Sequence, residues 1–129
     1  MEKDFQKWHT KKSDIDGIKK RPFFHEREIW FCHLGANVGA EEDGAGEDFL
    51  RPIVIFRKFN NEIFWAIPLT KKTKNNKFYF LFSFSERGQN TAILSQIKLV
   101  DAKRLLYKVG EISENDFTLL KNKFKALLP

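Results

Sequence analysis

Short apolar runs separated by turn-forming residues make up most of the chain after residue 25. Six of them have the length and the β-branched or aromatic composition of strands: 27–34, 50–57, 62–69, 77–84, 91–99 and 106–110. Asn60-Asn61 stands between the second and third runs and predicts a tight hairpin turn. The run Phe78–Phe84 is too apolar for a strand edge that faces water, so both of its faces are expected to be covered.

Two segments have helical spacing instead of strand spacing. Within residues 1–24, apolar residues recur three or four positions apart among lysines and acids, which predicts an amphipathic helical extension that closes at Arg21-Pro22. Ser113 predicts the N-cap of a terminal helix whose apolar stripe runs from Phe117 to Leu127. Many short strands and one closing helix predict a small, mainly β barrel with a C-terminal α-helix, formed by residues 25–129.

The composition favours one folded domain. The chain has 129 residues, of which 42% are hydrophobic and 15% aromatic, enough for a core. No apolar run reaches membrane length and no signal segment opens the chain, so we expect a cytoplasmic protein with no membrane contact. The single cysteine, Cys32, excludes an internal disulfide and favours a small buried hydrophobe. His9, His25 and His33 lack zinc-ligand spacing, so the sequence gives no sign of a zinc site.

The net charge of +6 is unevenly distributed. Nine Lys or Arg residues lie between Lys71 and Lys108, against two acids, whereas Gly39–Phe49 holds five acids and no base. A basic region of this kind favours contact with nucleic acid, although lysines that only solvate a surface give the same pattern.

Arg51 and Thr70 are the strongest candidates for chemistry. Arg51 precedes Pro52 at the head of an apolar strand, where a charge is costly unless it opens onto a cleft. Thr70 ends the next strand, and neighbouring strands can bring the cation and the hydroxyl to one rim. This pair suggests a phosphate site. The structural alternatives are an ion pair of Arg51 with Glu41 or Glu47, and ordinary backbone capping by Thr70.

A series of short segments, in order and spacing, resembles one protein family. The segments are Glu28-Ile29-Trp30, Gly39-Ala40-Glu41-Glu42, Arg51-Pro52-Ile53-Val54-Ile55, Ile67-Pro68-Leu69-Thr70, Ala92 to Lys98, Asp101 to Leu105 and Lys108 to Ser113. Over roughly residues 26–128 the chain resembles the MazF/PemK (Kid-like) toxins of type II toxin–antitoxin systems, which are endoribonucleases. The resemblance implies a five- or six-stranded SH3-like barrel of the PemK/MazF/CcdB type.

The resemblance also implies an activity and partners. Single-stranded RNA would be cut without a metal or other cofactor, by attack of its own 2′-hydroxyl, leaving a 2′,3′-cyclic phosphate and a 5′-hydroxyl. Arg51 would act as proton donor or stabilise the phosphorane, and Thr70 would hold the scissile phosphate. A homodimer would form the RNA groove, and a cognate antitoxin would occupy it.

Five further residues are weaker candidates for RNA binding. Lys71 follows Thr70 where the family often has a second hydroxyl, and Lys71 and Lys72 could add phosphate affinity. Gln96 matches a family glutamine, with a satisfied amide at a subunit interface as the alternative. Glu41 lies in the matching loop, and His25 at the start of the domain could approach the groove.

The chain departs from the family at two places. The loop Gly39–Leu50 is lengthened by an acidic, glycine-rich stretch, which we interpret as a gate over the RNA groove. Arg27 stands where the family usually has glycine. Two rival functions remain: a non-catalytic toxin that binds a protein such as DNA gyrase, and an RNA-binding barrel with a decayed site. The gyrase poison CcdB depends on a tryptophan near its C-terminus, whereas the last tryptophan here is Trp65.

Overall fold

The computed structural model describes residues 20–34 and 50–129. The helix predicted in the N-terminal extension and the acidic loop with Glu41 lie outside these residues. Residues 20–24 have no helical structure, and Phe24 is buried in the core.

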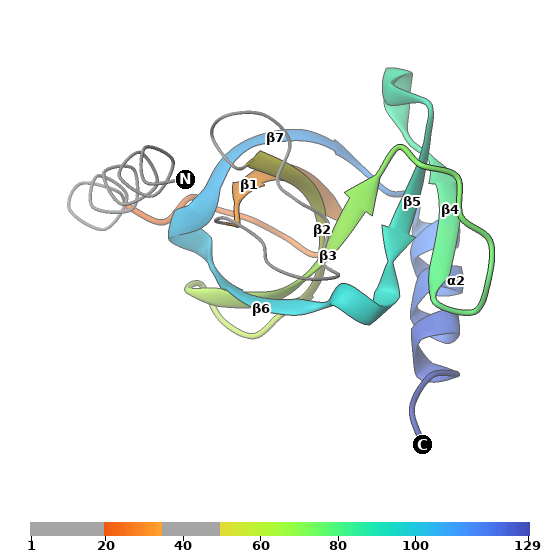
Figure 1. The fold of residues 1–129 in the computed structure, drawn as a ribbon. Coiled ribbons are helices and arrows are strands. Elements are labelled where there is room, and N and C mark those ends of the chain that lie inside the picture. Colours follow the sequence, from red (N-terminus) through yellow and green to blue (C-terminus); the bar gives the residue numbers. More distant parts are fainter. Residues whose placement is uncertain (1–19, 35–49) are drawn as a thin grey trace, which may run out of the picture.

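Seven antiparallel strands and one α-helix form the described fold (Figure 1). The strands are β1 (Glu28–His33), β2 (Leu50–Lys58), β3 (Ile63–Thr70), β4 (Tyr79–Ser83), β5 (Gln89–Ile93), β6 (Lys98–Asp101) and β7 (Leu105–Glu111). The sheet order is β4-β5-β3-β2-β1-β7, and β6 pairs with β3. The helix α2 (Glu114–Lys125) ends the fold, so the predicted mainly β architecture with a C-terminal helix is confirmed.

One predicted strand is wrong. Residues 91–99 form two strands, β5 and β6, separated by the 3₁₀ turn η2 (Leu94–Gln96). Both strands pair with β3, but β5 pairs with its last residues, Leu69 and Thr70, and β6 with its first residues. The turn moves the chain from one end of β3 to the other, which an unbroken strand cannot do. The count of five or six strands therefore becomes seven.

Alternate residues of β2 enter two different cores. Ile53 and Ile55 face one cluster, which also contains Phe24 and Phe64. Val54 and Phe56 face the second cluster, which contains Phe117 and Leu120 of α2. Because successive side chains of a strand point to opposite faces, the first cluster fills the barrel and the second lies between its wall and α2. Figure 1 shows β4, β5 and α2 together on that side.

The local turns follow their predicted chemistry. The carboxamide oxygen of Asn60 accepts hydrogen bonds from the amides of Glu62 and Ile63, closing the hairpin between β2 and β3. The Ser113 hydroxyl accepts from the amide of Asp116 and caps α2. The expectation for Phe78–Phe84 is only partly met, because β4 lies at the end of the sheet path and Phe78 is exposed.

Arg27, one of the two departures from the family pattern, has a left-handed backbone with φ of 79°. Glycine adopts this conformation freely, whereas a residue with a Cβ is strained in it. The Arg27 side chain donates to the carbonyl oxygen of Ile112 at 3.1 Å and lies 3.6–3.8 Å from the carboxylates of Glu111 and Glu114. These contacts link the start of β1 to the junction of β7 and α2.

Candidate active site

The candidate site lies where β2 and β3 separate. The two strands pair from Lys58 and Phe64 as far as Ile53 and Pro68. Beyond that point β2 keeps β1 as its neighbour, with Arg51 opposite Cys32, while Thr70 of β3 pairs with β5. Extending the register of Ile53 and Pro68 by two residues sets Arg51 and Thr70 across from each other. The divergence of the strands opens a cleft beside this pair.

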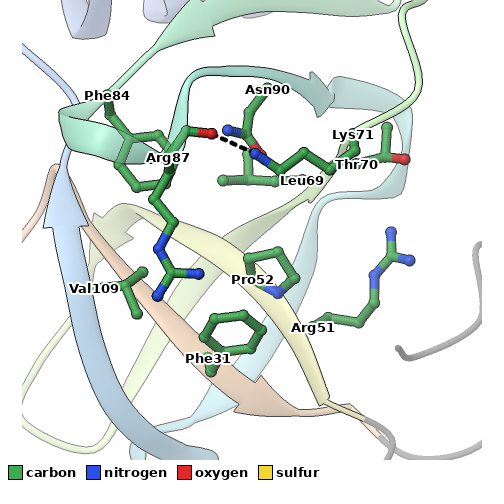
Figure 2. A pocket seen from close by; sticks show the side chains of 10 residues that line it. All are labelled: Phe31, Arg51, Pro52, Leu69, Thr70, Lys71, Phe84, Arg87, Asn90 and Val109. Carbon is green, nitrogen blue, oxygen red and sulfur yellow. Dashed lines mark hydrogen bonds between the residues drawn. The ribbon is translucent and has the colours of Figure 1, made fainter. Parts of the chain in front are cut away.

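The cleft has a volume of about 280 Å³ and a mixed lining (Figure 2). Its polar lining residues are Arg51, Thr70, Lys71, Arg87 and Asn90, and its apolar ones are Phe31, Pro52, Leu69, Phe84 and Val109. Arg51 and Thr70 lie together on one side of the view, and Arg87 lies with Phe31 and Val109 on the other. The sequence prediction that Arg51 opens onto a cleft next to Thr70 thus agrees with the geometry.

Arg51 and Thr70 are both largely buried, with 7% and 9% of their surfaces exposed. The Thr70 hydroxyl oxygen accepts a hydrogen bond from the amide of Lys72 at 3.2 Å. This bond orients the hydroxyl, as the capping interpretation expected, and leaves its hydrogen able to donate to a ligand oxygen. Lys71 reaches across the cleft, where its ammonium donates to the carbonyl oxygen of Arg87.

The weaker candidates are distributed unevenly around the molecule. Lys71 lines the cleft, and Lys72 contributes its backbone amide to Thr70. Gln96 is half-buried on η2, and His25 precedes β1 at the end opposite Cys32; neither lines the cleft. Their proposed RNA contacts therefore have no support from the cleft geometry.

Sequence reasoning missed Arg87, Asn90 and Phe31. Arg87 is in the 3₁₀ turn η1 (Ser85–Arg87), and Asn90 is in β5. The signal for a turn was the glycine that follows the arginine, since Gly88 has φ of 73°. The sequence did not indicate that this turn folds over the head of β2.

Cys32 lies opposite Arg51 in the strand register but cannot serve as a nucleophile. The thiol is completely buried, and desolvation raises its pKa to about 12 despite the nearby cations of Arg104 and Lys98. The prediction of a buried hydrophobe is confirmed.

Two carboxylates outside the cleft have perturbed pKa values. Burial of Glu28 opposes ionisation and is the largest single influence. Hydrogen bonds from the Trp30 indole at 2.9 Å and from His25, with the charge of Lys108, outweigh it and lower the pKa. At Asp101 burial is likewise outweighed, by two hydrogen bonds from Arg21 at 3.0–3.1 Å and one from the amide of Lys103.

Asp101 caps the 3₁₀ turn η3 (Ala102–Arg104), and its ionic partner is Arg21. The Arg104 guanidinium donates to the carbonyl oxygen of His33. Among residues 20–34 and 50–129, no cluster of three or more His, Cys, Asp or Glu side chains could hold a metal ion. None of the helices in this part of the chain is long and apolar enough to span a membrane.

Comparison with known proteins identifies the family. The PemK-like, MazF-like toxins of type II toxin–antitoxin systems match residues 25–128. The chain belongs to this family. No curated protein sequence matches it.

Solved structures with the same fold include a toxin and endoribonucleases from mycobacteria. The "Mycobacterium tuberculosis toxin MazF-mt6" is 11% identical with a TM-score of 0.60, and the match covers 78% of this chain and 94% of that one. An "Endoribonuclease in complex with its cognate antitoxin from Mycobacterial species" is 16% identical with a TM-score of 0.63, covering 83% and 98%. An "Endoribonuclease from Mycobacterial species" is 13% identical with a TM-score of 0.59, covering 87% and 99%. At these identities the likeness establishes the MazF-like fold.

Proposed function

We propose that this toxin is an endoribonuclease that cleaves single-stranded RNA at the cleft beside Arg51 and Thr70. The observation that carries the proposal is the pairing of a largely buried, permanently charged guanidinium with an oriented hydroxyl at one end of an open cleft. The names of two structural neighbours, both endoribonucleases, support the same activity.

The chemistry requires no group from outside the RNA to form the new bond. The 2′-oxygen attacks the adjacent phosphorus and loses its proton, the bond from phosphorus to the 5′-oxygen breaks, and that oxygen takes up a proton. The products are a 2′,3′-cyclic phosphate and a 5′-hydroxyl, and DNA is spared because it lacks the nucleophile.

Each residue of the pair has a distinct role in this reaction. Arg51 stabilises the negative charge that develops on the phosphorane, because its guanidinium stays protonated at any working pH and can donate two parallel hydrogen bonds. Such electrostatic stabilisation is usually the largest catalytic contribution. Thr70 donates its hydroxyl hydrogen to a phosphate oxygen and holds the phosphate against the guanidinium.

Two protein partners belong to the same proposal. A homodimer would extend the RNA-binding surface across two cleft regions. An antitoxin would silence the enzyme through an acidic segment docked against the exposed lysines that follow Thr70, namely Lys71, Lys72, Lys74 and Lys77. The structural neighbour solved with its cognate antitoxin supports a partner of this kind.

The antitoxin proposal is tested by salt dependence. Affinity for an acidic antitoxin segment should fall steeply as salt rises, since exposed charges are screened within about 8 Å at physiological ionic strength. An affinity that does not change with salt would exclude these lysines as its main contacts.

The activity is tested by incubating the purified protein with a long unstructured RNA in EDTA and mapping the new ends. We expect cyclic phosphate and 5′-hydroxyl ends. An oligonucleotide with one 2′-deoxy nucleotide at the mapped position should resist cleavage there and remain cleavable elsewhere. No cleavage, or cleavage of the deoxy bond, would overturn the proposal.

A further inference from the structure

The part of the cleft away from Arg51 and Thr70 has no role in the reaction described above. Its wall is formed by Phe31, Phe84 and Val109, with Pro52 and Leu69 between this wall and the catalytic pair. An apolar wall gains nothing by contacting a phosphate, which stays solvated or bound to cations. The apolar lining therefore fits a second group of the ligand, one that is uncharged and has an apolar face, next to the phosphate.

Arg87 and Phe31 form the flat surfaces of this apolar end. The Arg87 guanidinium lies 5.6 Å from the centroid of the Phe31 ring, and Arg87 is exposed on its turn. Aromatic rings and arginine planes are the two surfaces on which proteins stack unpaired RNA bases. The phenyl ring is supported by its contact with Tyr107, at 5.2 Å between centroids.

Asn90 adds a polar group to the same cleft. It is 3% exposed, and its amide nitrogen donates to the carbonyl oxygen of Gly88 at 3.3 Å; no other hydrogen bond of this side chain occurs among the described residues. A carboxamide has a second N–H and an acceptor oxygen. A buried amide with this spare capacity can read the hydrogen-bonding edge of a base.

Taken together, these features fit a flat group with an apolar face and a polar edge, attached to a phosphate. We infer that the apolar end of the cleft holds one nucleobase next to the cleaved phosphate, packed against the Phe31 ring and the Arg87 guanidinium and read by Asn90. A volume of about 280 Å³ lies just below the usual range of ligand pockets and suits a small flat group such as a single base. The inference rests on the proposed function and names its specificity-determining residues.

The test uses oligoribonucleotides in which an abasic nucleotide is placed at each position near the mapped cut. One position should lower kcat/KM of the wild type by about 10-fold or more, since stacking of one base is typically worth about 5- to 150-fold. Phe31→Leu should lower cleavage of the intact RNA to a similar level and cause no further loss on the abasic RNA. Phe59→Leu, at an exposed phenylalanine of the β2–β3 hairpin, is the matched control and should retain the full abasic effect.

A second measurement separates the inference from the proposed function. A fully 2′-O-methylated oligonucleotide cannot be cut but can bind. It would carry the fluorescent base 2-aminopurine at the sensitive position or, if no cleavage is seen, at each position in turn. Quenching of the 2-aminopurine fluorescence by wild type, and loss of that quenching in Phe31→Leu, would support the base site even if wild type cuts no RNA. The inference would be overturned if the wild type cleaves RNA but no abasic substrate is cleaved more slowly than the intact RNA. It would also be overturned if Phe31→Leu lowers cleavage of the intact and the abasic RNA equally. Either result would leave the proposed function standing. Asn90→Asp should change the base preference at the cut, and an unchanged preference would exclude base reading by Asn90.

Discussion

Replacement of Arg27 by alanine and by glycine separates two opposing contributions of this residue to stability. The arginine has φ of 79°, a conformation that costs an L-residue about 1–2 kcal/mol. The same residue donates one hydrogen bond to Ile112 and approaches two exposed carboxylates. Both substitutions remove these side-chain contacts, but only glycine also removes the backbone strain.

The expected magnitudes follow from these contacts. Loss of the hydrogen bond costs about 1 kcal/mol, and the two half-exposed ion pairs add little, so Arg27→Ala should lower the free energy of unfolding by about 1–2 kcal/mol. Relative to alanine, glycine relieves the backbone strain of about 1–2 kcal/mol but lowers stability by about 0.5–1 kcal/mol through the greater freedom of the unfolded chain. Arg27→Gly should therefore be more stable than Arg27→Ala by about 0.5–1 kcal/mol.

Urea unfolding of the two variants measures this difference directly. The control is the same pair of substitutions at Asn122, an exposed position within α2, where alanine should be more stable than glycine by about 0.8–1 kcal/mol. The order of the two residues should thus invert between positions 27 and 122. If alanine is the more stable residue at both positions, the left-handed backbone of Arg27 and the strain reasoning are refuted.

Three further outcomes are expected. Gly110→Ala should lower stability by about 1–3 kcal/mol and impair RNA cleavage, because an added Cβ would lie 2.9 Å from the ring of Phe84, a wall of the cleft; unchanged melting and cleavage would contradict this. Cys32 should resist alkylation in the folded protein at about pH 8 and react only after unfolding, since its pKa is about 12; rapid labelling under native conditions, read by mass spectrometry, would contradict its burial. The pKa of Asp101 is lowered, so its ion pair with Arg21 stabilises the fold fully at pH values above the ordinary carboxyl pKa of 3.8, and this stabilisation is lost as the pH falls below that value. The difference in free energy of unfolding between wild type and Arg21→Met should therefore shrink from about pH 6 to pH 3. A difference that grows on acidification would reverse the assigned sign.

The sequence predicted the elements that depend on local chemistry. The hairpin at Asn60 and the cap at Ser113 are set by side chains that bond to amides two or three residues away, so they can be read without tertiary structure. Arg51 and Thr70 could be paired because both stand at strand ends and consecutive antiparallel strands are usually neighbours. The confirmed family resemblance adds the overall barrel.

The missed features depend on long-range packing. The break at η2 arises because β5 and β6 use opposite ends of β3, which no local pattern in residues 91–99 signals. Arg87 and Asn90 reach the cleft only through the position of β5 beside the end of β3, although the glycine between them marked a turn. The sequence showed that Arg27 stands where the family usually has glycine, but only the dihedral angle of the structure explains why glycine is suited to that position.

The most direct test of the central claim is the single-turnover rate of RNA cleavage by Arg51→Ala and by Arg57→Ala. Both arginines lie on β2, but Arg57 is exposed and does not line the cleft. Removing one donor to the transition state typically lowers the rate about 100- to 1,000-fold. We predict a loss of that size for Arg51→Ala with unchanged melting, and a rate within a few-fold of wild type for Arg57→Ala. Cleavage by folded Arg51→Ala at nearly the wild-type rate would contradict the account.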